Sequence, residues 1–193
     1  MASWIRENRL LIPVLVFLCI VVASCQFLDT IIGVQQETTG FDVVETTIAD
    51  VHLAMQDGRV TARQLVEDYL ARIEAYDKRN AALNAIIEIN PGALARADKL
   101  DVAFAESGLT GPLHGIPMIV KDNYDFAGMP TTAGSASRAE SMPPDDSFQV
   151  RRIREAGAIV LAKSNMAEFA FSPNETIGSR IPGFTRNLSL IHI

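Results

Sequence analysis

The residue best placed to carry chemistry in this chain is Lys121, which ends the apolar run Ile116–Val120. A lysine at the end of an apolar strand is partly removed from water, and desolvation disfavours its charged form. An uncharged lysine can accept a proton from a reacting group near neutral pH. The alternative is a strand-end lysine whose ammonium group reaches into water and has no chemical role.

The neighbours of Lys121 are expected to fix its direction. Asp122 and Asn123 follow it directly, and short polar side chains of this kind hold turns and bond to nearby backbone groups. Lys163 ends a second apolar strand, Ala158–Ala162, so strand position alone does not choose between the two lysines.

Other kinds of chemistry have less support. Both cysteines, Cys19 and Cys25, lie in the first 25 residues, and the three histidines are scattered. We therefore expect no metal site, and without a phosphate-binding or dinucleotide-binding glycine motif we expect no cofactor. His114 is expected to be a packed or solvated turn residue rather than a catalytic one, and Ser135 and Ser137 are expected to be polar loop groups rather than nucleophiles.

Composition indicates a globular protein. The 193 residues are 48% hydrophobic and 21% charged, with a net charge of −6. This is enough apolar material for one folded domain. Because there is no basic stripe to neutralise phosphates, nucleic acid is not expected as a partner.

The first 25 residues have the order of a secretory signal peptide. Arg6 and Arg9 precede the apolar run Leu10–Val22, which is shorter than the roughly 20 residues of a membrane span. The ending Val22–Cys25 resembles a bacterial lipobox, in which the cysteine receives lipid after cleavage. We expect an exported protein of the bacterial cell envelope, anchored through Cys25 in the periplasm or at the outer membrane. Ordinary cleavage near Ser24, giving a secreted protein, is the alternative.

Strands and helices alternate after a tether that is expected to occupy residues 26–45. Capping boxes at Thr47 and Thr61 predict the first two helices, and fully apolar strands between helices are typical of a sheet covered on both faces. We therefore predict an α/β layered fold with parallel or mixed strands. The expected helices are Thr47–Gln56, Ala62–Tyr76, Ala93–Ser107 and Ser147–Ala156, and the expected strands are Ala85–Ile89, Pro117–Lys121 and Ala158–Ala162.

Four blocks in a fixed order resemble the amidase signature family. The resemblance extends over about residues 46–187, and the blocks are Gly111–Asn123, Ala127–Gly134, Arg152–Ala158 and Lys163–Phe169. It implies the N-terminal part of the mixed sheet of the amidase fold, covered by helices and incomplete in this chain. It also implies hydrolysis of a small-molecule or peptide amide, with no indication of oligomeric state.

The resemblance further implies a Ser–cis-Ser–Lys triad in which Lys121 is the base. A bridging serine relays the proton of a nucleophilic serine to the lysine, and an acyl-enzyme forms. The family carries both serines in downstream glycine-rich segments that this sequence lacks. By analogy with the family, Ala170, Phe171 and Ser172 would approach the acyl pocket, with ordinary loop packing as the alternative.

The last residues depart from the family pattern. After Asn187 the sequence turns to Leu188–Ile193, which looks like the translated end of a sequencing adapter, so we interpret these residues as a non-native tail on a truncated gene. A fragment without both serines is expected to be inactive, and its unpaired strand edges are expected to favour aggregation.

Two other functions stay open for the parent protein. One is the glutaminase subunit of a tRNA-dependent amidotransferase, against which the exported leader argues. The other is a non-catalytic envelope protein that keeps the amidase fold.

The anchor prediction concerns the mature N-terminus. We expect mass spectrometry of the protein from a bacterial membrane fraction to find a lipid-modified N-terminal Cys25. The Cys25→Ser variant is expected to be released from that fraction because it has no thiol to modify. An unmodified N-terminus near Ser24 in the wild-type protein would contradict the prediction.

Overall fold

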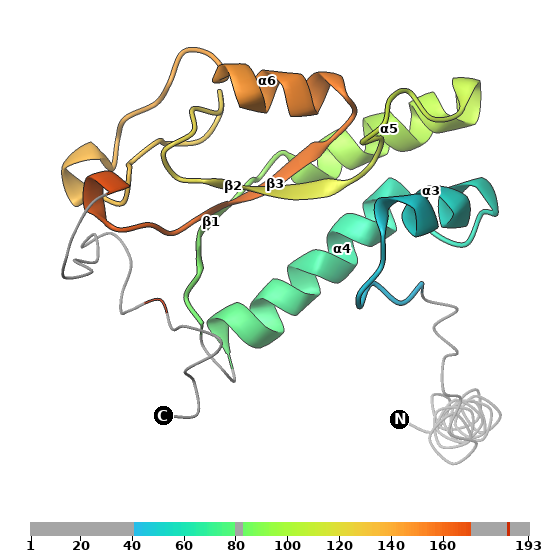
Figure 1. The fold of residues 1–193 in the computed structure, drawn as a ribbon, viewed down its shortest axis with the longest axis horizontal. Coiled ribbons are helices and arrows are strands. Elements are labelled where there is room, and N and C mark those ends of the chain that lie inside the picture. The colour runs from blue at the N-terminus through green and yellow to red at the C-terminus, as the bar shows by residue number, and fades with distance from the viewer. Residues whose placement is uncertain (1–40, 80–82, 171–184, 186–193) are drawn as a thin grey trace, which may run out of the picture. The chain divides into compact units, whose positions relative to one another are not determined.

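The computed structural model describes residues 41–79, 83–170 and 185 (Figure 1). The predicted leader, Cys25 and most of the predicted tether lie outside these residues. The described helices are α3 (Ile48–Gln56), α4 (Ala62–Arg72), α5 (Ala93–Ser107) and α6 (Phe148–Glu155), and the strands are β1 (Ile86–Ile89), β2 (Pro117–Lys121) and β3 (Ile159–Ser164). A π-helical turn, Ile73–Lys78, continues α4, and short 3₁₀ turns occupy Ala136–Arg138 and Glu168–Ala170.

The three strands form one mixed sheet in the order β1-β3-β2. Strand β2 runs parallel to β3, with Met118 opposite Val160 and Lys121 opposite Ser164. Strand β1 runs antiparallel to β3 on its other side. The predicted α/β class with mixed strands is therefore confirmed, and the predicted strand positions are close to those observed.

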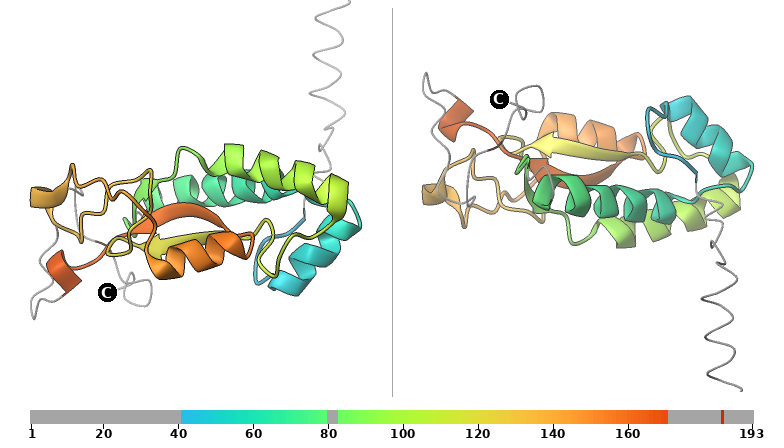
Figure 2. Two further views of the ribbon diagram at one scale, coloured as in Figure 1. Left: turned by 90° about the horizontal axis from the view of Figure 1, so that it is seen from above. Right: turned by 90° about the horizontal axis from the view of Figure 1, so that it is seen from below.

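Helices cover both faces of this sheet. Figure 2 shows α5 and α6 on opposite sides of the strands. On the α6 side, Val150 packs with Val120 and Val160, whereas Ile159 and Leu161 face a larger core built from α3, α4 and α5. Strand β3 is buried along almost all of its length because it lies between two strands and two helical layers.

The start of each N-terminal helix follows the predicted capping box. Thr47 accepts a hydrogen bond from the Asp50 backbone, and Thr61 accepts one from Gln64. Satisfying the free N–H groups of the first turn defines where a helix begins. Phe41 and Val43, from the segment expected to be a tether, pack partly buried against the core.

Two residues at the ends of the expected helices differ from what their types suggest. Ser147 occupies the N-cap position of α6, but its hydroxyl is buried without a hydrogen bond in the described structure. The Ser147 backbone N–H donates to Asp125 O at 2.9 Å, which joins the start of α6 to the segment after β2. Tyr76, the last residue of the expected helix Ala62–Tyr76, lies in the π-helical turn and is 53% exposed.

The free edge of β2 exposes apolar surface within the described structure. Ile119 is 47% exposed, and it lines a groove of about 550 Å³ between the sheet and α4. Tyr69, Ile73 and Leu161 also line this groove. Within the described residues no helix is long and apolar enough to cross a membrane.

Of the two states expected for His114, packed or solvated, the structure shows the packed one. It is fully buried in the turn before β2, where its ring contacts Phe104 and its backbone oxygen is 3.0 Å from His52 Nε2. Its Nδ1 accepts a hydrogen bond from the Thr110 backbone N–H at 3.2 Å, which is the pattern of a neutral ring. Burial lowers the pKa of His114, and the nearby His52 acts in the same direction.

We predict an acid-sensitive contribution of His114 to stability. Below about pH 6.5 the unfolded chain binds a proton at this ring that the folded chain does not, so stability is lost as pH falls. The loss can reach about 1.4 kcal/mol per pH unit. Urea unfolding between pH 5 and pH 8 should show a smaller acid loss for His114→Asn, which keeps a polar group without titrating. An equal loss in both proteins would contradict this prediction.

Candidate active site

Lys121, Asp122 and Asn123 lie where β2 ends and a turn begins. Lys121 and Asn123 are exposed, whereas Asp122 is buried at 1% exposure. Successive side chains of a strand point to opposite faces. Val120 and Asp122 therefore point into the layer under α6, and Lys121 points to the other face.

The expected burial of Lys121 is not present among the described residues. The lysine follows an apolar run, but it lies on the edge strand of the sheet, and no described side chain covers it. In the described structure no carboxylate pairs with its amine. The assignment of Lys121 as a base stays a prediction, and the desolvation that it requires has to come from residues outside those described.

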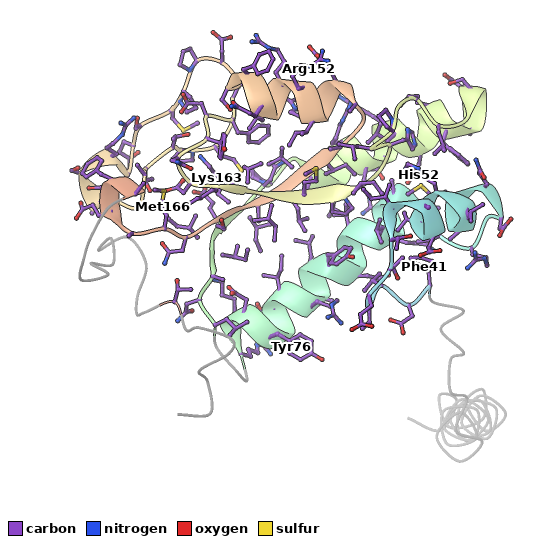
Figure 3. The ribbon with its side chains drawn as sticks, in the orientation of Figure 1. Phe41, His52, Tyr76, Arg152, Lys163 and Met166 are labelled. Atoms are coloured by element: carbon purple, nitrogen blue, oxygen red, sulfur yellow. The ribbon has the colours of Figure 1, made fainter. Side chains whose placement is uncertain are left out.

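The buried lysine is Lys163, at the end of the central strand (Figure 3). Its Nζ lies 3.3 Å from Asp122 Oδ1, and the two side chains are 0% and 1% exposed. It also donates to Pro130 O at 3.0 Å and to Thr131 Oγ1 at 2.9 Å. The sequence contained a signal for this burial, because a lysine that ends a fully apolar strand between two helical layers has no short path to water.

The surroundings of Lys163 suit a structural role. Burial lowers the pKa of Lys163, and the Asp122 carboxylate opposes that shift by charge and by hydrogen bonding. The ammonium group has three N–H donors, and the structure supplies three acceptors. Enclosed and bonded to these groups, this lysine serves as a structural partner of Asp122.

Asp122 also holds the loop that follows Pro130. Its carboxylate accepts hydrogen bonds from the Thr132 hydroxyl and from the Gly134 N–H, the latter at 3.2 Å. Its backbone oxygen accepts from Ala133 N at 3.1 Å. The segment Thr131–Gly134 is therefore fixed against the ends of β2 and β3 at both main-chain and side-chain level.

Ser135 and Ser137 continue this loop as polar structural groups, as predicted. Ser135 is buried, its hydroxyl lies 2.8 Å from Ser137 Oγ, and it donates to the Glu168 carboxylate. The Phe169 backbone N–H donates to Ala133 O at 2.8 Å, so the turn after β3 docks on the same loop.

The remaining predicted site residues are not gathered with Lys121 by the described structure. Ala170 is exposed in the turn after β3, and its N–H donates to Ala167 O at 2.9 Å. Phe171 and Ser172 lie outside the described residues, as does Cys25. Among the described residues no three His, Cys, Asp or Glu side chains gather in a way that could hold a metal ion.

The geometry therefore offers one exposed amine at the end of a rigid sheet. Lys121 ends an edge strand, and the residue after it, Asp122, is held by the buried ion pair with Lys163. The loop Thr131–Gly134 is bonded to Asp122 at the same end of β2. An amine held in this way can exchange protons with a group brought to that face.

Comparison with known proteins supplies the wider context. Residues 64–187 match the family model described as Amidase. A glutamyl-tRNA(Gln) amidotransferase subunit of Halorhodospira halophila is 40% identical over 134 residues, covering 68% of this chain and 27% of that protein. A probable amidase of Arabidopsis thaliana is 39% identical over 136 residues, covering 67% and 25%.

The fold is similar to that of a solved enzyme. The peptide amidase of Stenotrophomonas maltophilia superposes with a TM-score of 0.63 at 44% identity, covering 65% of this chain and 26% of that one. The chain thus spans about a quarter of the length of the relatives that it matches.

A substitution at Gly134 tests how closely the loop Thr131–Gly134 packs against the segment after β3. Gly134 has φ +71°, and an added Cβ would lie 2.5 Å from Met166 O. Gly58 has φ +70° with open space around it, so Gly58→Ala carries the backbone strain alone. In urea unfolding we expect Gly134→Ala to lose about 1–3 kcal/mol more than Gly58→Ala, because the loop must move away from β3. Equal losses would show that the loop is loosely docked.

Proposed function

The chain belongs to the amidase family, and from this premise we propose that the complete protein hydrolyses a carbon–nitrogen amide bond with Lys121 as its proton acceptor. The observation that carries the proposal is the place of Lys121 inside the matched region, at the end of β2, with its amine unpaired among the described residues. Lys163, the other strand-end lysine, is buried, donates two hydrogen bonds and forms an ion pair with Asp122.

The proposed chemistry is acyl transfer through a serine ester. Lys121 takes a proton from a bridging serine, which takes the proton of the nucleophilic serine as that oxygen bonds to the amide carbon. The carbon–nitrogen bond then breaks, and the departing amine receives the proton. Water attacks the ester in a second step and releases the acid. Both serines are to be supplied by parts of the protein outside this chain.

In this mechanism the described residues fix the main chain at Lys121 and offer a surface that further chain can cover. The contacts of the Asp122 carboxylate with Gly134 and Lys163 fix the main chain on the C-terminal side of Lys121. The pairing of β2 with β3 fixes it on the N-terminal side. The open face of β2, where Ile119 is half exposed, is suited to be covered by further chain. That cover would provide the desolvation that an uncharged lysine requires.

The proposed substrate is a small-molecule or peptide amide. The peptide amidase relative supports this class. A second candidate is glutamine hydrolysis for a tRNA-dependent amidotransferase, which the name of the Halorhodospira halophila relative supports. The exported leader that we propose for residues 1–25 favours the first candidate, because aminoacylation takes place inside the cell.

Replacement of Lys121 tests the proposal in the complete protein. We expect Lys121→Met to lower kcat/KM for amide hydrolysis by about 100- to 10,000-fold, the usual contribution of general acid–base catalysis. Stability should change little, because methionine keeps most of the length of the side chain and removes no ion pair of the described structure. Steady-state kinetics with a peptide amide measures the first effect and thermal unfolding the second.

The control is Lys99→Met, an exposed lysine on α5, which should keep wild-type turnover. A folded wild-type protein that hydrolyses neither peptide amides nor glutamine would favour the non-catalytic envelope protein instead. Full activity of Lys121→Met would remove Lys121 from the mechanism while leaving the amidase assignment intact.

A further inference from the structure

We propose that Lys163 and Asp122 act together as positioning residues for Lys121, fixing the direction in which its amine leaves strand β2. The inference rests on the proposed function, since it concerns the same lysine. It adds a role for Lys163, a buried charged side chain that the proposed chemistry itself does not use.

The strand register places the Lys163–Asp122 ion pair on the face of the sheet opposite to the Lys121 side chain. Val120 is opposite Lys163, and Lys121 is opposite Ser164. The Asp122 N–H donates to Ser164 O at 3.1 Å, so the main chain on the C-terminal side of Lys121 is still bonded to β3. Since Val120 and Asp122 both point under α6, Lys121 must point away from them.

The ion pair is closed to solvent and bonded to the loop beside it. Lys163 donates hydrogen bonds to Pro130 O and to Thr131 Oγ1 in addition to its contact with Asp122. Thr131 Oγ1 donates its own proton to Tyr124 O at 3.4 Å, which leaves its lone pairs for the lysine. Tyr124 in turn donates from its backbone N–H to Lys121 O at 2.9 Å. A chain of contacts thus runs from the Lys163 amine to the carbonyl of Lys121.

The same pair fixes the turn on the other side. Asp122 accepts from Thr132 and Gly134, and its carbonyl accepts from Ala133. If Lys163 is removed, a buried carboxylate loses its only cation in the described structure, and the turn has to rearrange to expose or re-pair it. The rearrangement would change the path of the main chain at Asp122, and Lys121 is the residue before it.

The expected consequence is a defect in turnover rather than in substrate affinity. A displacement of about 1 Å in a reacting group can cost about 100-fold in rate. We expect Lys163→Met in the complete protein to lower kcat about 100-fold, with KM within about threefold of wild type. Asp122→Asn, which keeps the size of the side chain, should have an effect in the same direction.

A matched control is available in a second ion pair. Lys78 Nζ lies 2.9 Å from the buried Asp77 carboxylate, and it also donates to Ile86 O at 2.6 Å. Asp77 is buried and Lys78 is exposed, and the pair adjoins β1, two strands away from Lys121 in the sheet. Lys78→Met should lower stability without changing kcat per folded molecule, because none of its partners contacts Lys121 or Asp122. Thermal unfolding of each variant gives the fraction that is folded under assay conditions.

The pH profile separates positioning from simple loss of folded protein. Fewer folded molecules lower kcat/KM by the same factor at every pH, whereas a displaced base also shifts the limb of the profile that reports its protonation. We expect a shifted limb for Lys163→Met and for Asp122→Asn, and an unshifted limb for Lys78→Met. Unshifted limbs with wild-type kcat in the first two variants would overturn the inference.

A readout that does not depend on turnover distinguishes this inference from the proposed function. The rate at which acetic anhydride modifies the Lys121 amine, measured by mass spectrometry of the folded protein, depends on the surroundings of that amine. We expect at least about a threefold change in Lys163→Met and none in Lys78→Met, because the uncharged fraction of an amine follows its surroundings. This result would support positioning even if wild-type protein hydrolysed no amide, whereas unchanged Lys121 reactivity would overturn it in an active or an inactive protein.

Discussion

The buried pair of Asp122 and Lys163 is the constraint on which this end of the molecule depends. Removing two charges from water is costly, and the cost is offset only where the geometry is good and the remaining polar atoms are bonded. Both conditions hold, because the ammonium has three acceptors and the carboxylate holds a hydroxyl and backbone N–H groups. Removal of one partner from such a pair costs about 3–5 kcal/mol. The ends of β2 and β3 and the loop Thr131–Gly134 are therefore held as one unit.

The two strand-end lysines differ because their strands occupy different places in the sheet. Strand β3 is central and covered on both faces, so Lys163 is enclosed and must be paired. Strand β2 is at the edge of the described sheet, so Lys121 is open on the opposite face. One lysine is thus suited to hold structure as a fixed cation, and the other to meet a partner group. This division is the physical basis for assigning the chemistry to Lys121.

Much of the fold could be predicted from local sequence signals. The capping boxes at Thr47 and Thr61 and the apolar strand before Lys163 are short-range patterns, and the structure agrees with them. Ser147 occupies the N-cap position of α6 but makes no side-chain cap, so the residue type located the start of the helix without giving its hydrogen bonding. The burial of Lys121 was expected from its apolar neighbours alone, but burial depends on which strand lies beside β2. The partnership of Asp122 with Lys163 joins residues far apart in the chain, so spacing could not reveal it.

The most direct test of this account is the charge of the two lysines in the complete protein. Heteronuclear NMR of labelled lysine side chains, assigned with the Lys121→Arg variant, reports whether each amine carries its extra proton at the pH of greatest hydrolysis. We expect Lys163 to be a cation and Lys121 to be uncharged under those conditions. A cationic Lys121 beside a neutral Lys163 would contradict the account, because it would exchange the structural and chemical roles of the two residues.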